Sequence, residues 1–201
     1  KTAGQSDVLI IALGADEWTG KNRNLDAFLE QDCIKKHSTF VESGRVHKNH
    51  KNKPTDPVFG KVKASAYNHK MGRIELIVGL DNEKCAAELE DLERGKPVSF
   101  SMGSKQKYDV CTWCGHKSYN GTKDRCDHIP SQLGEINKHG SMCAMVNPDP
   151  NWFEISIVKR GADRIAFGFS KLSTSDKLKT SSAHIIDLYR NDLYIPEIPL
   201  I

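Results

Sequence analysis

The chain has 201 residues, of which 38% are hydrophobic and 27% charged, as in an ordinary soluble domain that carries at most a small insert. Lys plus Arg number 29 and Asp plus Glu 26, so the net charge of +3 excludes a highly basic nucleic-acid-binding tail and an acidic disordered chain as the main theme. No apolar run approaches ~18 residues and no signal-peptide pattern opens the chain, so we expect neither a membrane-spanning helix nor a membrane partner. Because the first residue is Lys1 rather than Met, we expect a fragment or a processed product.

The first eighty residues contain three strand-like segments and one helical one. Residues 7–13 are a continuous apolar run, typical of a buried strand, whereas residues 58–67 and 73–80 alternate like two paired strands joined by a turn. Residues 24–36 show the apolar spacing of a helix. The polar residues 42–57, which contain two histidines and two prolines, predict a loop.

Residues 81–169 contain one more helical segment and three more strand-like segments. Residues 81–94 predict a helix, and residues 97–103 predict another strand. Residues 130–150 are polar, with Gly and Pro, and are expected to be irregular. Residues 152–158 alternate strictly like a strand, and residues 164–169 predict a short final strand.

These elements, in the order β-α-ββ-α-β-insert-ββ, predict an α+β fold with a mostly antiparallel β core and packed helices. We expect one domain over residues 1–170, with a small insert over residues 105–130. The Ser/Thr/Lys-rich stretch that follows predicts a linker and a C-terminal tail over residues 171–201.

Three of the six cysteines crowd into one short segment beside two histidines. Cys111 and Cys114 have the Cys-x-x-Cys spacing, and Cys126 and His128 follow as Cys-x-His. This spacing is typical of metal ligands rather than of disulfides, and free thiolates indicate a reducing, intracellular compartment. The other three cysteines are expected to be buried as small hydrophobic residues: Cys33, Cys85 and Cys143.

The Cys/His segment suits zinc. Three sulfur ligands and one nitrogen ligand form a common tetrahedral set for Zn²⁺, and Gly115 permits the tight turn that directs the first two sulfurs at one ion. Since four protein ligands leave no open position, we predict a structural zinc site that stabilises an insert too short to own a core. His116 is either a spare or a substitute ligand.

Candidate residues for nucleophilic catalysis are scattered over the chain. Ser101 shares one face of a predicted strand with Ser99, its alternative as a nucleophile. A serine hydroxyl becomes nucleophilic when a neighbouring base, usually His, removes its proton and a third group orients that base. His47 and His50 are candidate bases, and Glu154 is a suitable carboxylate. By themselves these residues indicate little, because strand serines are usually structural and loop histidines are usually solvated.

Four segments in a fixed order carry more information. They are residues 50–62 (HKNKPTDPVFGKV), 72–81 (GRIELIVGLD), 95–103 (GKPVSFSMG) and 153–166, which contain FEISIV and GADRIA. This order resembles that of the prohead (head-maturation) serine proteases of tailed bacteriophages, a family related to the herpesvirus assemblins. The resemblance covers about residues 7–169, and some members carry a similar Cys/His insert directly after the serine strand.

The resemblance implies an assemblin-like barrel and gives three residues a role. Ser101 matches the nucleophile because a Met-Gly pair follows it, His50 matches the general base, and Glu154 matches the acidic residue of the third strand. The spacing from His50 to Gly60 is longer than the family pattern, so His47 remains an alternative base. The identity of the third member varies among relatives, and Glu154 is the acidic residue that stands at its position here.

The implied activity is that of a serine endopeptidase. Its substrates would be phage scaffold, capsid and portal-type proteins and the protease itself, cleaved inside the assembling head in the host cytoplasm. Lys159 and Arg160 are candidates to assist at the oxyanion, whereas Gly161 departs from the family, which often has Pro there. A hydrophobic-x-Glu sequence at residues 195–197 resembles cleavage sites of some relatives, so cleavage after Glu197 is a hypothesis beside an ordinary apolar tail. A homo-oligomer is left open.

Three other interpretations stay open. A zinc-binding module that grips nucleic acid or protein draws support from the cations near the Cys/His segment: Lys105, Lys107, Lys117, Lys123 and Arg125. The low net charge argues against nucleic acid as the primary ligand. A capsid component that kept the fold and lost activity is the second interpretation. A metalloenzyme, the third, needs an open metal position, for example if Cys126 or His128 were not a ligand.

Overall fold

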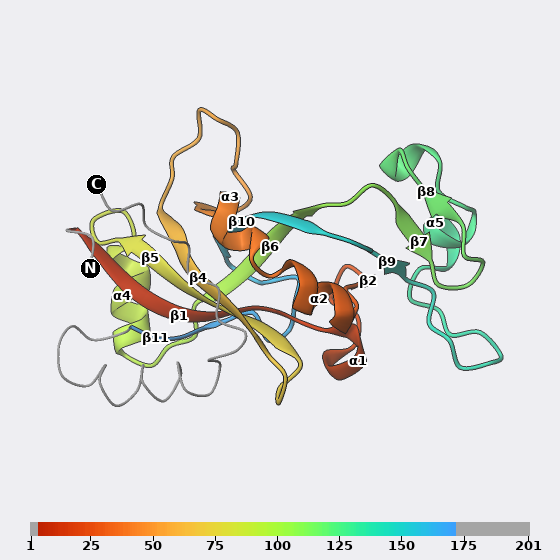
Figure 1. Cartoon of the computed structure of the whole chain (residues 1–201), viewed down its shortest axis with the longest axis horizontal. Helices are drawn as coiled ribbons and strands as arrows, with labels where there is room; N and C mark the ends of the chain where they lie inside the picture. Colours follow the sequence, from red (N-terminus) through yellow and green to blue (C-terminus); the bar gives the residue numbers. More distant parts are fainter. Residues whose placement is uncertain (1–3, 172–201) are drawn as a thin grey trace.

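A computed structural model describes residues 4–171 of the protein and has a mixed α+β fold made mostly of strands (Figure 1). Seven strands form a large curled sheet, and four short strands form a second sheet in the part of the chain that projects to the right in Figure 1. The expected α+β class is confirmed. The predicted linker and tail, with the candidate cleavage sequence at residues 195–197, lie outside the described residues.

The large sheet has the strand order β11-β1-β5-β4-β3-β10-β6. Its neighbouring strands are antiparallel except β3 and β10, which run parallel. In chain order the strands are β1 (Gln5–Gly14), β3 (Arg45–Lys48), β4 (Gly60–Asn68), β5 (Arg73–Asp81), β6 (Ser99–Lys105), β10 (Asn151–Val158) and β11 (Gly168–Lys171). The strands predicted from residues 7–13, 58–67, 73–80, 97–103 and 152–158 are thus confirmed, with small shifts of their bounds.

Strand β1 and the β4–β5 hairpin form the centre of the core. Their apolar side chains are buried, and Val8, Ile10 and Leu76 are fully inaccessible to solvent. The hairpin turns tightly because the Asn68 side-chain oxygen accepts hydrogen bonds from two following backbone N–H groups, and Gly72 takes a left-handed φ of 58°. The structure of this hairpin therefore follows from residues that are close to one another in the sequence.

The two edges of the large sheet are brought together by residues 166–168. The N–H of Ile11 on β1 donates to the carbonyl of Phe167 at 2.9 Å, and the N–H of Phe100 on β6 donates to that of Ala166 at 2.9 Å. These bonds connect β1, the neighbour of the edge strand β11, to β6, the strand at the other edge, so the sheet curls into a half-barrel around the core.

Four short helices accompany the large sheet: α1 (Asp16–Thr19), α2 (Glu30–Lys36), α3 (Thr39–Ser43) and α4 (Ala86–Glu93). Helix α5 (His128–Gln132) and a 3₁₀ turn at Gly121–Lys123 lie instead in the segment between β6 and β10. Helix α3 packs on β10, where Phe40 stacks on Trp152 with ring centroids 5.2 Å apart. Within residues 4–171, every helix is too short or too polar to cross a membrane.

The second sheet belongs to the insert, which occupies residues 106–150 between β6 and β10. Its order is β2-β9-β7-β8, from β2 (Asp26–Ala27), β7 (Asp109–Cys111), β8 (Lys117–Ser118) and β9 (Met145–Val146). Because β2 comes from the N-terminal part of the chain, its parallel pairing with β9 attaches the insert to the core. The segment between β6 and β10 runs to residue 150, past residue 130, where the predicted insert ends.

Two predicted elements are wrong in their extent. The helix expected over residues 24–36 begins only at Glu30, because Leu25 has a left-handed φ of 64° and Asp26–Ala27 pairs with β9. The loop expected over residues 42–57 contains the end of α3 and the whole of β3. Strand β3 forms because it pairs with β10, a long-range contact that local composition does not reveal.

Smaller corrections concern three other segments. The helix expected over residues 81–94 begins after a turn, at Ala86. The stretch 130–150, expected to be irregular, contains the end of α5 and strand β9. The last strand begins at Gly168 rather than at residue 164.

Candidate functional site

The candidate nucleophile and carboxylate lie on two neighbouring strands. Strand β6 pairs antiparallel with β10, so that Ser101 faces Ser156 and Gly103 faces Glu154. Both strands place alternate residues on one side of the sheet. Ser101 is 6% exposed and Glu154 is 1% exposed, so the carboxylate is held inside the protein and the serine lies just below the surface.

The candidate base His50 follows β3, in a turn of unusual backbone conformation. Asn49 and His50 both have left-handed φ angles, 53° and 56°. This turn is tied to β10, because the Asn49 N–H donates to the carbonyl of Ile157 at 2.9 Å and the His50 N–H donates to Ser156 Oγ at 3.1 Å. Strained backbone of this kind is common where a side chain must be aimed.

The side chain of His50 is joined to the buried carboxylate. His50 Nδ1 lies 2.7 Å from Glu154 Oε1. The hydrogen bond to Glu154, opposed by partial burial, raises the pKa of His50 above its ordinary value of 6.5. With Nδ1 donating to the carboxylate, Nε2 is left as the basic nitrogen, which is the tautomer that a general base requires.

Ser156 completes this arrangement and was given no role in the sequence analysis. Its hydroxyl donates to Glu154 Oε2 at 2.7 Å and accepts the His50 N–H, while the residue is fully buried. One side chain therefore connects the carboxylate to the backbone of the histidine. The sequence signal was the alternation Glu-x-Ser in a strand, which places both side chains on one face but does not say what they contact.

The packing around Gly103 explains why glycine stands two positions after Ser101. A Cβ atom at residue 103 would lie 2.5 Å from Glu154 Oε1 and 2.9 Å from Glu154 Cγ. Only glycine therefore leaves room for the carboxylate in its present position. The Ser-x-Gly pattern is thus a packing requirement of the site.

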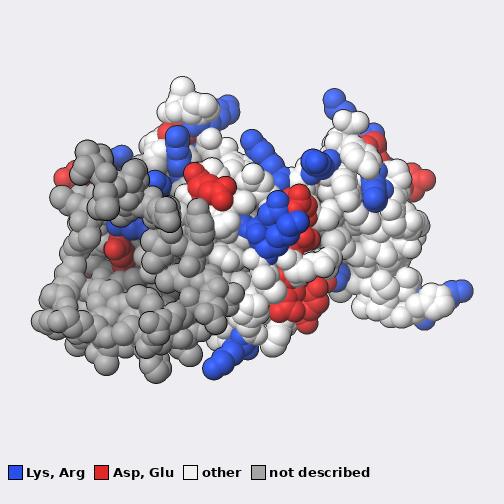
Figure 2. Space-filling view, viewed as in Figure 1, with Lys and Arg blue, Asp and Glu red and all other residues white. Residues whose placement is uncertain are grey.

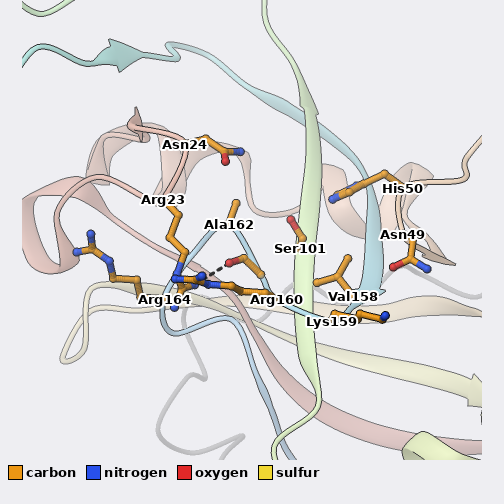
Figure 3. A pocket seen from close by; sticks show the side chains of 11 residues that line it. Arg23, Asn24, Asn49, His50, Ser101, Val158, Lys159, Arg160, Ala162 and Arg164 are labelled. Atoms are coloured by element: carbon orange, nitrogen blue, oxygen red, sulfur yellow. Dashed lines mark hydrogen bonds between the residues drawn. The ribbon is translucent and has the colours of Figure 1, made fainter. Parts of the chain in front are cut away.

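Ser101 and His50 line one cleft of about 840 Å³ (Figure 3). In Figure 3 the His50 ring points toward the Ser101 hydroxyl from the opposite wall. Within residues 4–171 no direct hydrogen bond joins the Ser101 and His50 side chains. In enzymes, bonds of this kind often tighten only when a substrate binds. The structure therefore brings Ser101, His50 and Glu154 together.

The cleft is strongly cationic. Among the described residues no carboxylate lines it, whereas four basic side chains do: Arg23, Lys159, Arg160 and Arg164. Arg23 Nη1 donates to the carbonyl of Gly161 at 2.6 Å, the bond drawn as a dashed line in Figure 3, and so fixes the loop after β10. The other three cations have no ion-pair partner among the described residues.

The alternative residues lie elsewhere. Ser99 lines a different cavity, of about 270 Å³, and faces Val158 across the strand pair. His47 lies on β3, is 3% exposed and lines a cavity of about 670 Å³. Of the two candidate bases, His50 is the one beside Ser101.

The four predicted metal ligands converge in the insert. One donor atom from each of Cys111, Cys114, Cys126 and His128 lies within 4.8 Å of the others, so this group could hold a metal ion. Donors around a tetrahedral zinc lie roughly 3.8 Å apart, given Zn–S bonds near 2.3 Å. The set of three thiols and one imidazole therefore fits zinc after a contraction of about an ångström.

The first two ligands lie on a tight turn of the kind predicted. Gly115 has a φ of 70°, and its N–H donates to the carbonyl of Cys111 at 2.9 Å. Burial works against ionisation of Cys111, but hydrogen bonds from the backbone of Cys114 and Trp113 lower its pKa overall. His116 lies outside the group of four, and its Nε2 bonds to the carbonyl of Asp124 at 2.6 Å.

The other cysteines are buried, as predicted. Cys33, Cys85 and Cys143 have no exposed surface, and all six cysteines are free of disulfides. Burial raises the pKa of Cys85 and of Cys143 to about 11, which favours the neutral thiol. Cys143 lies beside the metal-ligand group, where its Sγ is 3.6 Å from the carbonyl of His128.

The cations of the insert do not form a patch of one sign on the face seen in Figure 2, where Lys or Arg and Asp or Glu lie side by side. Arg125 is 3.8 Å from the Asp109 carboxylate, and Lys105 and Lys117 each lie 4.9 Å from the centre of an aromatic ring. Three of the five cations that favoured a nucleic-acid module therefore have partners within the chain.

Comparisons with protein-family models, with curated proteins and with solved structures find no match to this chain. The function is therefore inferred from the geometry of the site and from the sequence resemblance.

Proposed function

We propose that the protein is a serine endopeptidase in which Ser101 is the nucleophile, His50 the general base and Glu154 the residue that orients the base. The observation that carries this proposal is the 2.7 Å contact between His50 and the buried Glu154, beside the cleft that Ser101 lines. A base held by a buried carboxylate next to a serine is the arrangement that activates a hydroxyl group.

The chemistry is acyl transfer. His50 Nε2 accepts the Ser101 proton while Oγ attacks the substrate carbonyl, and the resulting imidazolium is stabilised by the Glu154 carboxylate. His50 then returns the proton to the leaving amine as the C–N bond breaks, which leaves an acyl-enzyme. A water molecule, activated by the same base, releases the acid product and restores Ser101.

The oxyanion needs hydrogen-bond donors near Ser101. We assign this role to the loop after β10, where Lys159 and Arg160 line the cleft. The Arg23 side chain holds the carbonyl of Gly161 in the same loop, which limits reorganisation when charge develops.

The charge of the cleft supports an acidic peptide as substrate. Of the residues that the structure describes, four cations and no carboxylate line it, so the field favours a substrate that brings negative charge close to the scissile bond. The resemblance to the prohead proteases supports scaffold, capsid and portal-type proteins as the substrate class, with cleavage in the assembling phage head inside the host cytoplasm. Cleavage of the chain itself after Glu197 belongs to the same proposal.

We assign zinc to the Cys111, Cys114, Cys126 and His128 group. Four protein ligands leave no position for substrate, so a bound ion would cross-link the insert rather than take part in the reaction. This assignment favours a structural role over a metalloenzyme.

The test combines a chemical probe with candidate substrates. A fluorophosphonate should label the wild-type protein and Ser99→Ala but not Ser101→Ala, as read by intact-mass spectrometry. Co-expression with the candidate scaffold and capsid proteins should give defined fragments with the first two proteins and none with Ser101→Ala.

The outcomes separate the alternatives. Labelling of Ser101→Ala with loss of labelling in Ser99→Ala would show that the nucleophile is wrong. A folded wild-type protein that is neither labelled nor able to cut any partner would refute the peptidase and favour a non-catalytic capsid component.

A further inference from the structure

A further cavity lies where the insert meets the core. Its volume is about 420 Å³, and we call it the insert groove. The core contributes one wall and the insert the other, through Lys21, Leu25, Arg164, Thr112, Ser141 and Met142. Neither the triad nor the metal-ligand group uses this cavity.

The insert groove continues from the catalytic cleft. Arg164 lines both cavities, and the loop over residues 20–25 lines the cleft with Arg23 and Asn24 and the groove with its flanking residues. In Figure 3 Arg164 lies at the end of the cleft farthest from His50. A peptide bound in extended form advances about 3.3 Å per residue, so a chain that runs past Arg164 enters the groove within a few residues.

The insert wall of the groove is held by the loop that carries the metal ligands. Thr112 Oγ1 donates to the carbonyl of Met142 at 2.7 Å, and Trp113 Nε1 donates to that of Ser141 at 2.9 Å. Thr112 and Trp113 are the two residues between the first pair of predicted ligands. The position of the groove wall therefore depends on the conformation of this loop.

We propose that the insert groove is a distal substrate subsite, which binds the extended peptide beyond the residues that contact the Ser101 cleft. The half-buried side chains of Leu25 and Met142 offer apolar contact to a substrate side chain, and Arg164 offers charge at the entrance. The insert thereby selects substrates for the peptidase. This inference rests on the proposed function, because it needs a peptide bound at Ser101.

The test asks whether the dependence of cleavage on peptide length disappears when the groove is altered. Wild-type protein is first incubated with a proteome-derived peptide library, and a cleaved peptide is then trimmed one residue at a time from either end. For the wild type, kcat/KM should fall roughly tenfold when the peptide residue that occupies the groove is trimmed away. We call this drop in kcat/KM the length step. Ser141→Trp, which narrows the groove, should have low kcat/KM for the long peptides and show no drop at that step.

Matched variants keep the result interpretable. His139→Trp adds the same ring in the same loop but outside the groove lining, and it should behave like the wild type. Met142→Ala removes one apolar contact and should halve or abolish the length step, which provides a second reading if Ser141→Trp does not fold. Metal content by native mass spectrometry checks that the insert is intact in each variant.

Each outcome has a definite meaning. An unchanged length step in folded Ser141→Trp and Met142→Ala would overturn the subsite while leaving the peptidase in place. Failure of the wild type to cut any library peptide would overturn the proposed function and the subsite with it. A length step that disappears only in the groove variants supports the subsite.

Discussion

The half-barrel and the insert hold their key side chains by different means. In the half-barrel, Glu154 and Ser156 are fixed by hydrogen bonds inside a large apolar core. The insert has only a small buried cluster, made of Cys111, Ile129, Cys143 and Met145. Burial is enough to preorganise a site on a large sheet, whereas a segment of this size needs a cross-link to keep its shape.

Loss of the metal-ligand group should have the largest effect, and it should be confined to the insert. Cys126→Ala, or treatment with a chelator, should unfold the insert and leave the half-barrel folded, because structural zinc contributes about 10 kcal/mol or more to small domains of this kind. Limited proteolysis should then cut within residues 106–150, while far-UV circular dichroism keeps the signal of the large sheet.

The control for this change is Cys143→Ala. Cys143 is buried in the same insert but lies outside the group of four ligands, so this variant should retain metal. Equal resistance to proteolysis in Cys126→Ala and the wild type would show that the insert does not depend on a metal.

Gly103→Ala should damage the site from within the half-barrel. The new methyl group would lie 2.5 Å from Glu154 Oε1, so the carboxylate and the His50 ring that it holds must move. Displacements near 1 Å can cost about 100-fold in rate, and we expect kcat to fall by that order. Steady-state kinetics beside Ser104→Ala, on the same strand, measures it; similar kcat values for both variants would contradict the packing argument.

Ser156→Ala should have a smaller effect on the same site. The change leaves Glu154 Oε2 and the His50 N–H without their buried partner, which costs about 1–3 kcal/mol of unfolding free energy. Chemical denaturation measures this loss. Fluorophosphonate labelling should also slow, whereas Ser99→Ala should change neither quantity; a Ser156→Ala protein as stable and reactive as the wild type would remove Ser156 from the site.

The smallest expected effect is a shift in the pH dependence of activity when Glu154 is changed. His50 must be neutral to accept the Ser101 proton, so kcat/KM should rise with pH through the pKa of His50. The hydrogen bond to Glu154 raises that pKa, so the midpoint should lie above 6.5. In Glu154→Gln the midpoint should fall back toward 6.5, and a midpoint that does not move would show that Glu154 does not act on the base.

Local patterns predicted the parts of the fold that local contacts determine. Strands β1, β4, β5 and β10 follow runs of apolar or alternating residues, and each was expected at nearly its observed place. Strand β3 was not expected, because its four residues gain their conformation from pairing with β10, more than a hundred residues away. The early start given to helix α2 has the same origin, since Asp26–Ala27 pairs with β9.

In the candidate site, too, the residues set by local spacing could be predicted and those set by long-range contacts could not. The metal ligands could be chosen from spacing alone, because Cys-x-x-Cys and Cys-x-His restrict which atoms can meet. The resemblance favoured His50 as the base and left His47 as an alternative. The left-handed turn after β3, which places His50 beside Ser101, is not revealed by a polar sequence with two histidines. The contacts of Ser156 depend on strand register between distant segments and were beyond reach for the same reason.

The left-handed turn at Asn49 and His50 sets a limit on how this protein can evolve. Backbone conformations of this kind cost about 1 kcal/mol or more in residues other than glycine, and histidine tolerates them less well than asparagine. Selection for thermal stability alone would favour glycine at both positions. Glycine at residue 50 would remove the imidazole. At this turn, therefore, a gain in thermal stability would cost the proposed catalytic base.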